Sequence, residues 1–293
     1  MIVRNPKFQL LRELQAANRL LGCQATPTDA AIHRTRLHIK KARAVLRLLT
    51  QSQGTTRYKK VQHALQGANR ILRRSRDYTV ARDTLAALAR RTMHMKPAVQ
   101  AIEQSWRRHG DPLYAPLTPR DCRQARIELG RAAKFVRGGF SKQYRAEELF
   151  VALTRTYRDA HKAYRHAART HSKRMWHECR KQSKCLYYQL VITEVSRGLP
   201  GTLRQAHLLE STLGRQRDLA LLAREIRRRT VDTSAGASGV LLYLCNRCKR
   251  LQRRVDRYAA TLYRTKPSAF AKRMRGQARA AAAHRHPPTT ADG

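Results

Sequence analysis

The chain has 293 residues, and its 62 Lys and Arg residues against 19 Asp and Glu residues give a formal net charge of +43. Hydrophobic residues make up 42% of the sequence, enough for a buried core, which excludes a wholly disordered chain. Because like charges repel each other in a compact protein, we expect a polyanionic partner to stabilise the fold. Charge alone leaves DNA, RNA, anionic lipid and polyphosphate as candidate partners.

Cysteine usage and the N-terminal segment bear on location. The six cysteines are spread along the chain, and residues 1–14 contain no unbroken apolar stretch of the kind found in secretion signals. We therefore expect reduced thiols and a cytoplasmic location. The longest apolar runs are shorter than the roughly 20 residues that span a bilayer, so a membrane is not a predicted partner.

Apolar residues recur at helical spacing and runs of β-branched residues are absent, so the sequence predicts an all-α fold. In the N-terminal part we expect helices at residues 6–21, 27–50, 57–75 and 77–93, the second of them capped by Thr26 or Thr28. Residues 110–119 contain three prolines and are the predicted internal boundary. Beyond it we expect helices at residues 120–137, 142–170, 173–197, 203–229 and 240–263.

This boundary predicts an N-terminal helical half, residues 1–112, and a C-terminal helical half, residues 119–265. The remaining residues, 266–293, are basic, rich in Ala and end near a Pro-Pro pair, so we expect a mobile tail.

Two motifs occur in the same order in both halves. The first is His-x-x-Arg-x-x-x-Lys, at His33, Arg36 and Lys40 and again at His177, Arg180 and Lys184. The second is an Arg-Asp pair, at Arg76-Asp77 and at Arg217-Asp218. Because both motifs recur in order, the sequence predicts two similar helical bundles. We expect Asp77 and Asp218 to cap helices or to orient neighbouring Arg side chains.

A row of positive side chains follows one side of the helix predicted at residues 27–50. At about 100° per residue, five residues fall in one narrow arc with apolar residues on both sides: His33, Arg36, Lys40, Arg43 and Arg47. A solvated face normally lies opposite the apolar face, so this pattern predicts cations that point into a cleft. The solvated face is expected to hold Arg34, His38 and Lys41.

The second copy of the row is thinner. His177, Arg180 and Lys184 repeat the arc, Lys181 adds a charge beside it, and Tyr187 stands where the first copy has Arg43. Buried cations without counter-charges are unfavourable, and the chain has too few carboxylates to pair them all. We therefore expect an external anion in the cleft. A chain of linked phosphates suits such a row, because successive residues are one helical turn or less apart, about 5 Å.

These residues resemble the CHAD domain, the family of conserved-histidine α-helical domains. The most specific stretches are residues 177–190 and 213–222, and the similarity covers roughly residues 5–265. The resemblance implies two pseudo-symmetric bundles of long antiparallel helices that enclose a basic pocket, and it implies binding of inorganic polyphosphate. The two halves differ in places, since Arg73 stands where the second half has Gly214.

Taken with the cationic row, the resemblance implies a polyphosphate-binding groove, and we expect a cytoplasmic protein that associates with polyphosphate granules. The predicted binding residues are His33, Arg36, Lys40, Arg43, Arg47, Arg76, His177, Arg180, Lys181, Lys184 and Arg217. If the histidines contact phosphate, the anion favours the charged imidazole, and binding should tighten below neutral pH.

Nucleic acid is the alternative partner, as a non-specific competitor for the basic surface. Aromatic residues make up only 6% of the sequence, which is little for stacking on bases. We do not expect an enzyme, because the acidic residues are scattered and no phosphate-cradling glycine loop occurs. No cofactor or metal is predicted either. Cys245 and Cys248 have zinc-like spacing, but they lie inside a predicted helix without a second pair of ligands nearby.

Overall fold

The computed structural model describes residues 5–22, 27–49, 55–108, 117–140, 144–193, 199–229 and 235–283. These ranges form α-helices and one short 3₁₀ helix and contain no β-strand, which confirms the predicted all-α class. No helix in them is long and apolar enough to cross a membrane. The helices are α1 (Pro6–Gly22), α2 (Asp29–Leu48), α3 (Thr55–Ile71), α4 (Arg73–Arg91), η1 (Met93–Met95), α5 (Lys96–Arg108), α6 (Pro119–Gly139), α7 (Ala146–Thr170), α8 (Lys173–Ile192), α9 (Pro200–Arg229), α10 (Ala235–Leu262) and α11 (Pro267–Ala283).

Local side-chain chemistry explains several helix ends. The Thr28 hydroxyl accepts a hydrogen bond from the Ala31 backbone N–H at 3.2 Å, so Thr28 is the N-cap of α2, while Thr26 lies outside the described residues. Thr118 and Asp121 form a reciprocal capping box at the start of α6, directly after the proline-rich segment. His171 adopts the left-handed conformation with φ of 49° and ends α7.

Some expectations on the helices are wrong. α4 begins at Arg73 and not at Asp77, α10 begins at Ala235 and not at Val240, and α5 is a helix that the sequence pattern does not predict. α5 has few apolar residues, but Val99, Ile102 and Trp106 share one face and are buried against α10. The packing of this face outweighs the polar composition of the rest of the helix.

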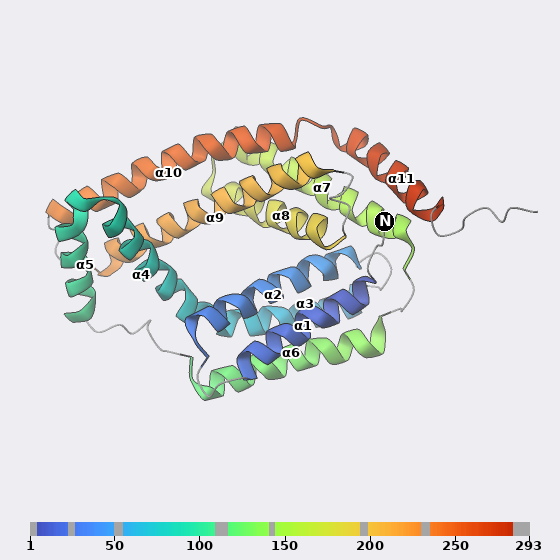
Figure 1. The fold of residues 1–293 in the computed structure, drawn as a ribbon, viewed down its shortest axis with the longest axis horizontal. Helices are drawn as coiled ribbons and strands as arrows, with labels where there is room; N and C mark the ends of the chain where they lie inside the picture. Colours follow the sequence, from blue (N-terminus) through green and yellow to red (C-terminus); the bar gives the residue numbers. More distant parts are fainter. Residues whose placement is uncertain are drawn as a thin grey trace, which may run out of the picture.

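Three groups of buried apolar residues hold the helices together. The first joins α1, α2, α3 and α6, and the second joins α7, α8 and α11 with one end each of α9 and α10. The third joins α4 and α5 with the other ends of α9 and α10. Figure 1 shows α1, α2, α3 and α6 as one bundle beneath the layer of α8, α9 and α10, with α4 and α5 at one end.

This packing does not follow the two sequence halves, residues 1–112 and 119–265. α6 comes after the predicted boundary, yet it packs on α1 and α3. α4 and α5 come before the boundary, yet they pack on α9 and α10. The long helices therefore cross between the halves, and the pseudo-symmetry of the halves stays a prediction.

The two helices that carry the repeated motif, α2 and α8, pack directly against each other. The Gln189 side-chain amide of α8 donates a hydrogen bond to the Ala44 carbonyl of α2 at 3.1 Å, and both groups are buried. Leu48 of α2 belongs to the core of the α7–α8 layer. These contacts fix the register in which the two motif helices face each other.

The prediction of a mobile tail from residue 266 is wrong for residues 267–283, which form α11 and pack on α7. Phe270 stacks on Tyr157 of α7 with 4.0 Å between ring centroids, and Phe270 and Met274 are only 2% and 1% exposed. The Tyr157 hydroxyl donates to the carbonyls of Leu262 and Thr265, at 2.9 and 2.8 Å, which holds the connection between α10 and α11. Two apolar residues one turn apart suffice to dock the helix because α7 offers a matching surface.

Phe270→Ala should lower the free energy of unfolding by about 3 kcal/mol, because it leaves a cavity against the Tyr157 ring. Urea unfolding followed by circular dichroism measures this change. Arg275→Ala, at an exposed position of the same helix, is the control and should change stability by less than about 0.5 kcal/mol. Equal stability of the two variants would contradict a docked α11.

Candidate functional site

The cations of the first motif lie on α2 among buried apolar residues. Arg36, Lys40, Arg43 and Arg47 are half-buried, whereas His33, at the start of the row, is exposed. Ile39, Ala44, Leu46 and Leu48 beside them are buried. The helix therefore holds four long cationic side chains half-buried among apolar residues, and the His33 imidazole lies at the exposed end of the row.

Five cations from three helices lie close together around Lys40 and Arg180, and we call them the central cluster. They are Arg36 and Lys40 of α2, Arg180 and Lys184 of α8, and Arg217 of α9. Burial, followed by repulsion from Lys184, Arg36 and Arg180, lowers the pKa of Lys40 from 10.5 to about 7. Burial and the charge of Arg217 likewise lower the pKa of Arg180. The structure thus brings together cations that lie far apart in the sequence.

Two carboxylates of α9 act on this cluster. Glu210 accepts a hydrogen bond from Lys184 Nζ at 2.5 Å, and the two side chains are 14% and 17% exposed. Asp218, two turns further along α9, acts on Arg180 and Lys184. Burial still lowers the pKa of Lys184, so desolvation outweighs the attraction of these carboxylates. With two carboxylates from the described residues against five cations, the cluster carries an excess of positive charge.

Arg180 also has an unused hydrogen-bond donor. Its Nε is buried and has no hydrogen-bond partner among the described residues. Buried donors in proteins are nearly always paired, so such a group needs a reason. An anion that enters the cluster would supply the acceptor.

The remaining predicted cations form a second group, the peripheral cluster, on another side of α8. Arg43, Arg47 and Lys181 lie around the half-buried Cys185, and desolvation raises the pKa of its thiol. Arg47 donates to Asp159 of α7 at 2.7 Å and to Gln182 at 2.5 Å, and Lys181 pairs with Glu178 at 3.1 Å. The single row predicted on α2 is therefore divided between two clusters in the folded protein. In the second cluster, Arg47 and Lys181 are paired with carboxylates.

The two motif histidines lie at the exposed edge. His177 is close to Arg217 and Arg180, and burial together with these charges lowers its pKa. His33 is also exposed. The side chain of Arg76 lies outside the described part of the chain.

The prediction that Asp77 and Asp218 cap helices is wrong, because both lie inside helices, α4 and α9. Asp77 accepts a hydrogen bond from Arg73 at 3.1 Å, and Asp218 acts on Arg180 and Lys184. The alternative interpretation, that they orient neighbouring cationic side chains, agrees with this geometry.

The solvated face predicted on α2 also needs correction. Arg34 is exposed, but His38 and Lys41 are half-buried. His38 Nδ1 lies 2.6 Å from a carboxylate oxygen of Glu13 on α1, and the same buried carboxylate accepts from Gln9 at 2.8 Å. His38 therefore holds α1 and α2 together, because α1 covers the side of α2 that the sequence left open.

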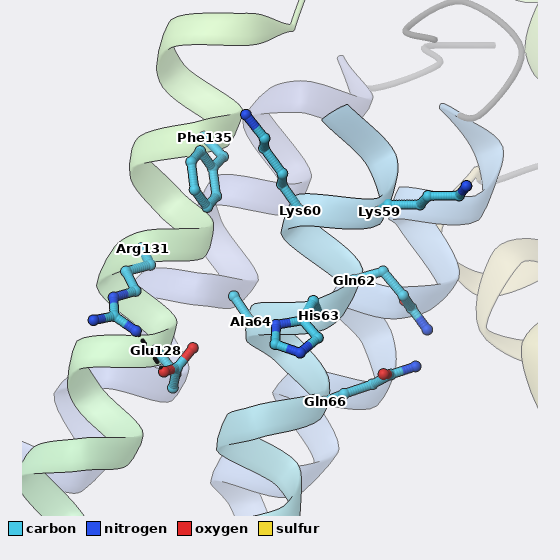
Figure 2. A pocket seen from close by; sticks show the side chains of 9 residues that line it. All are labelled: Lys59, Lys60, Gln62, His63, Ala64, Gln66, Glu128, Arg131 and Phe135. Carbon is cyan, nitrogen blue, oxygen red and sulfur yellow. Dashed lines mark hydrogen bonds and ion pairs between the residues drawn. The ribbon is translucent and has the colours of Figure 1, made fainter. Parts of the chain in front are cut away.

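A hollow of about 810 Å³ lies elsewhere, between α3 and α6. It is lined by Lys59, Lys60, Gln62, His63, Ala64, Gln66, Glu128, Arg131 and Phe135. Figure 2 shows Lys60 next to the Phe135 ring and Arg131 paired with Glu128. Its Lys, His and Arg side chains are exposed, so water solvates their charges, and none of the predicted binding residues lines it. The charges of the half-buried central cluster are less well solvated, so an external anion would stabilise them more than it would stabilise the charges of this hollow.

A family model of the CHAD domain matches residues 9–227, a span that contains every residue of the central cluster. The chain belongs to the CHAD domain family. The fold is also similar to the crystal structure of the CHAD domain from the plant Ricinus communis, with a TM-score of 0.62 and 18% identity over 89% of this chain and 91% of that chain. No curated protein sequence matches the chain.

Sequence reasoning missed Glu210 of α9 at the candidate site, and it named Gly214 only as a difference between the two halves. Glu210 precedes the Arg217-Asp218 pair by about two turns and Gly214 precedes it by about one turn, on the same side of the helix. A signal for them is present, since positions 210, 214, 217 and 218 share helical spacing. The Arg-Asp pair by itself does not reveal it, because the pair covers less than one turn of the helix.

Lys40→Met should raise the stability of the free CHAD domain below about pH 7 by roughly 1–3 kcal/mol, because it removes a half-buried charge repelled by its neighbours. In the wild type, the pKa of Lys40 falls from its ordinary value of 10.5 to about 7 on folding, so the unfolded chain binds more protons between these values. Wild-type stability therefore contains a contribution that rises with pH in this window, and the variant should lack it.

Thermal unfolding at about pH 6 and about pH 9 measures both effects. Lys181→Met, at a side chain that is 58% exposed, is the control and should behave as the wild type does. A Lys40→Met protein that is less stable than the control at about pH 6 would contradict the repulsion.

Proposed function

We propose that this CHAD domain binds inorganic polyphosphate in the central cluster. The observation that carries the proposal is the excess of half-buried positive charge where α2, α8 and α9 meet. Such charge is unfavourable in the free protein and becomes favourable when an anion supplies counter-charges and acceptors. The unused donor of Arg180 supports the same conclusion.

The arrangement suits a chain of phosphates better than a single anion. The central and the peripheral clusters follow each other along α2, since Arg36 and Lys40 belong to the first and Arg43 and Arg47 to the second. A flexible polyanion that lies along this helix would contact both. Arg offers a planar fork to phosphate oxygens and Lys a mobile point charge, so the mixture tolerates an irregular ligand.

The family resemblance implies the same ligand. The proposed role is binding without catalysis and without a cofactor. The proposed location is the cytoplasm, on polyphosphate granules.

Nucleic acid is the second candidate, and one surface favours it. α10 presents six exposed cations within three turns, which are Arg247, Lys249, Arg250, Arg253, Arg254 and Arg257. The side chains of this surface are exposed to solvent. The surface suits non-specific contact with a phosphate backbone, which depends strongly on salt.

Two variants with the same loss of charge separate these candidates. Arg36, Lys40, Arg180 and Lys184→Ala should weaken polyphosphate binding by about 100-fold or more, because charge-assisted hydrogen bonds in a partly buried site are lost. Arg247, Lys249, Arg250 and Arg254→Ala on α10 should weaken it by less than about tenfold. Fluorescence anisotropy with labelled polyphosphate at near-physiological salt measures both affinities.

Circular dichroism checks that both variants remain helical. Competition with DNA, RNA and unlabelled polyphosphate at equal phosphate concentration then tests specificity. Equal loss in the two variants, or equal displacement by all three competitors, would leave only a generic basic surface.

Affinity for polyphosphate should be greatest below about pH 7 and decrease as the pH rises. The bound anion raises the pKa of Lys40, so the complex keeps a proton that the free protein loses above about pH 7. His177, whose pKa is lowered in the free protein, should act in the same direction at lower pH. Calorimetry in buffers of different ionisation enthalpy counts the protons taken up. The same affinity at about pH 6 and about pH 9 would contradict this coupling.

A further inference from the structure

The Glu210 carboxylate stands where an anion is expected. It accepts the hydrogen bond of Lys184 Nζ at 2.5 Å and raises the pKa of Lys40, Arg180 and Lys184 against the opposing effects of burial and repulsion. Among the described residues no other side chain has a hydrogen bond with Lys184 Nζ. The carboxylate therefore performs for three cations the electrostatic role that a phosphate group would perform.

The space beside Glu210 is open. Gly214 lies one turn after Glu210 on the same side of α9, and a Cβ atom added to it would meet no atom within 4 Å. Glycine inside a helix lowers its stability by up to about 1 kcal/mol relative to alanine, so this position is not favourable for the helix itself. It leaves room next to the carboxylate and to Arg217 and Asp218, which follow on the same side.

We propose that Glu210 is an internal counter-ion that takes the place of a phosphate group in the free protein and is displaced from Lys184 when polyphosphate binds. The inference rests on the proposed function and deepens it. Glu210 neutralises part of the cluster and keeps the free protein stable, and the open space at Gly214 gives the ligand or the displaced carboxylate room to move.

This arrangement sets a threshold for binding. Every anion that uses Lys184 must first replace Glu210, so the same factor reduces the affinity of every such ligand. An anion with few charges makes few other contacts, so its affinity stays low. A long polyphosphate also contacts the remaining cations, and these contacts compensate for the affinity lost in displacing Glu210. Glu210 is in this sense a residue that determines specificity for long polyanions.

Glu210→Gln tests the proposal, with Glu128→Gln as a matched control. Both carboxylates are 14% exposed, both pair with one cation, and both substitutions change the net charge by the same amount. Glu128 lies on α6, in the hollow between α3 and α6. Glu210→Gln should bind labelled polyphosphate roughly tenfold more tightly than the wild type, because one competing charge is gone. Glu128→Gln should stay within about twofold of the wild type.

Thermal unfolding gives a second readout. Without ligand, Glu210→Gln should unfold at a lower temperature than the wild type, because Lys184 loses its counter-charge, and polyphosphate should raise its unfolding temperature by more than it raises that of the wild type. If Glu210→Gln does not fold, Glu210→Asp keeps the charge but shortens the side chain by one methylene, and its affinity should exceed that of the wild type.

The outcomes separate the two proposals. A wild type that does not bind polyphosphate overturns the proposed function and the inference with it. A wild type that binds, with a Glu210→Gln variant that binds equally or more weakly, overturns the inference alone and assigns Glu210 to positioning Lys184. If Glu128→Gln binds more tightly than the wild type and Glu210→Gln does not, the binding site lies in the hollow between α3 and α6, and the inference is overturned.

Discussion

The structure depends on positive charge that is held half-buried where three helices meet. A side chain such as Lys40 would be fully charged in water, yet burial and three neighbouring cations bring its pKa to about 7. Apolar packing must supply the free energy that keeps these groups together, and it does so through the buried residues that flank the row on α2. The fold thus holds these charges together at an electrostatic cost, which apolar packing offsets.

The arrangement of the cores explains how the helices are held against this repulsion. α2 takes part in the core of its own bundle and, through Leu48, in the core of the opposite layer. α9 belongs to the second core at one end and to the third at the other. Because α2 and α9 each take part in two cores, repulsion between the cationic side chains does not separate these helices.

The two groups of cations are balanced to different degrees. In the peripheral cluster, Arg47 and Lys181 each have a carboxylate partner, and Arg47 also ties α2 to α7 and α8. In the central cluster, Glu210 pairs with Lys184 while the pKa of Lys40 and of Arg180 stays low. Neighbouring parts of one row thus differ in how far their charges are paired, and the carboxylates of α7 and α9 set this difference.

The sequence by itself determined the helical class and most helices, because apolar spacing, Thr28 and the prolines before α6 act locally. It also determined which cations are placed within apolar surroundings, since Arg36 and Lys40 share an arc with buried neighbours on both sides. Only the tertiary structure decided that α11 is docked, that His38 is paired with Glu13, and that the row divides between two faces of α8. These outcomes depend on partners distant in sequence, such as Glu210 for Lys184, and helical periodicity carries no information about which distant surface a side chain will meet.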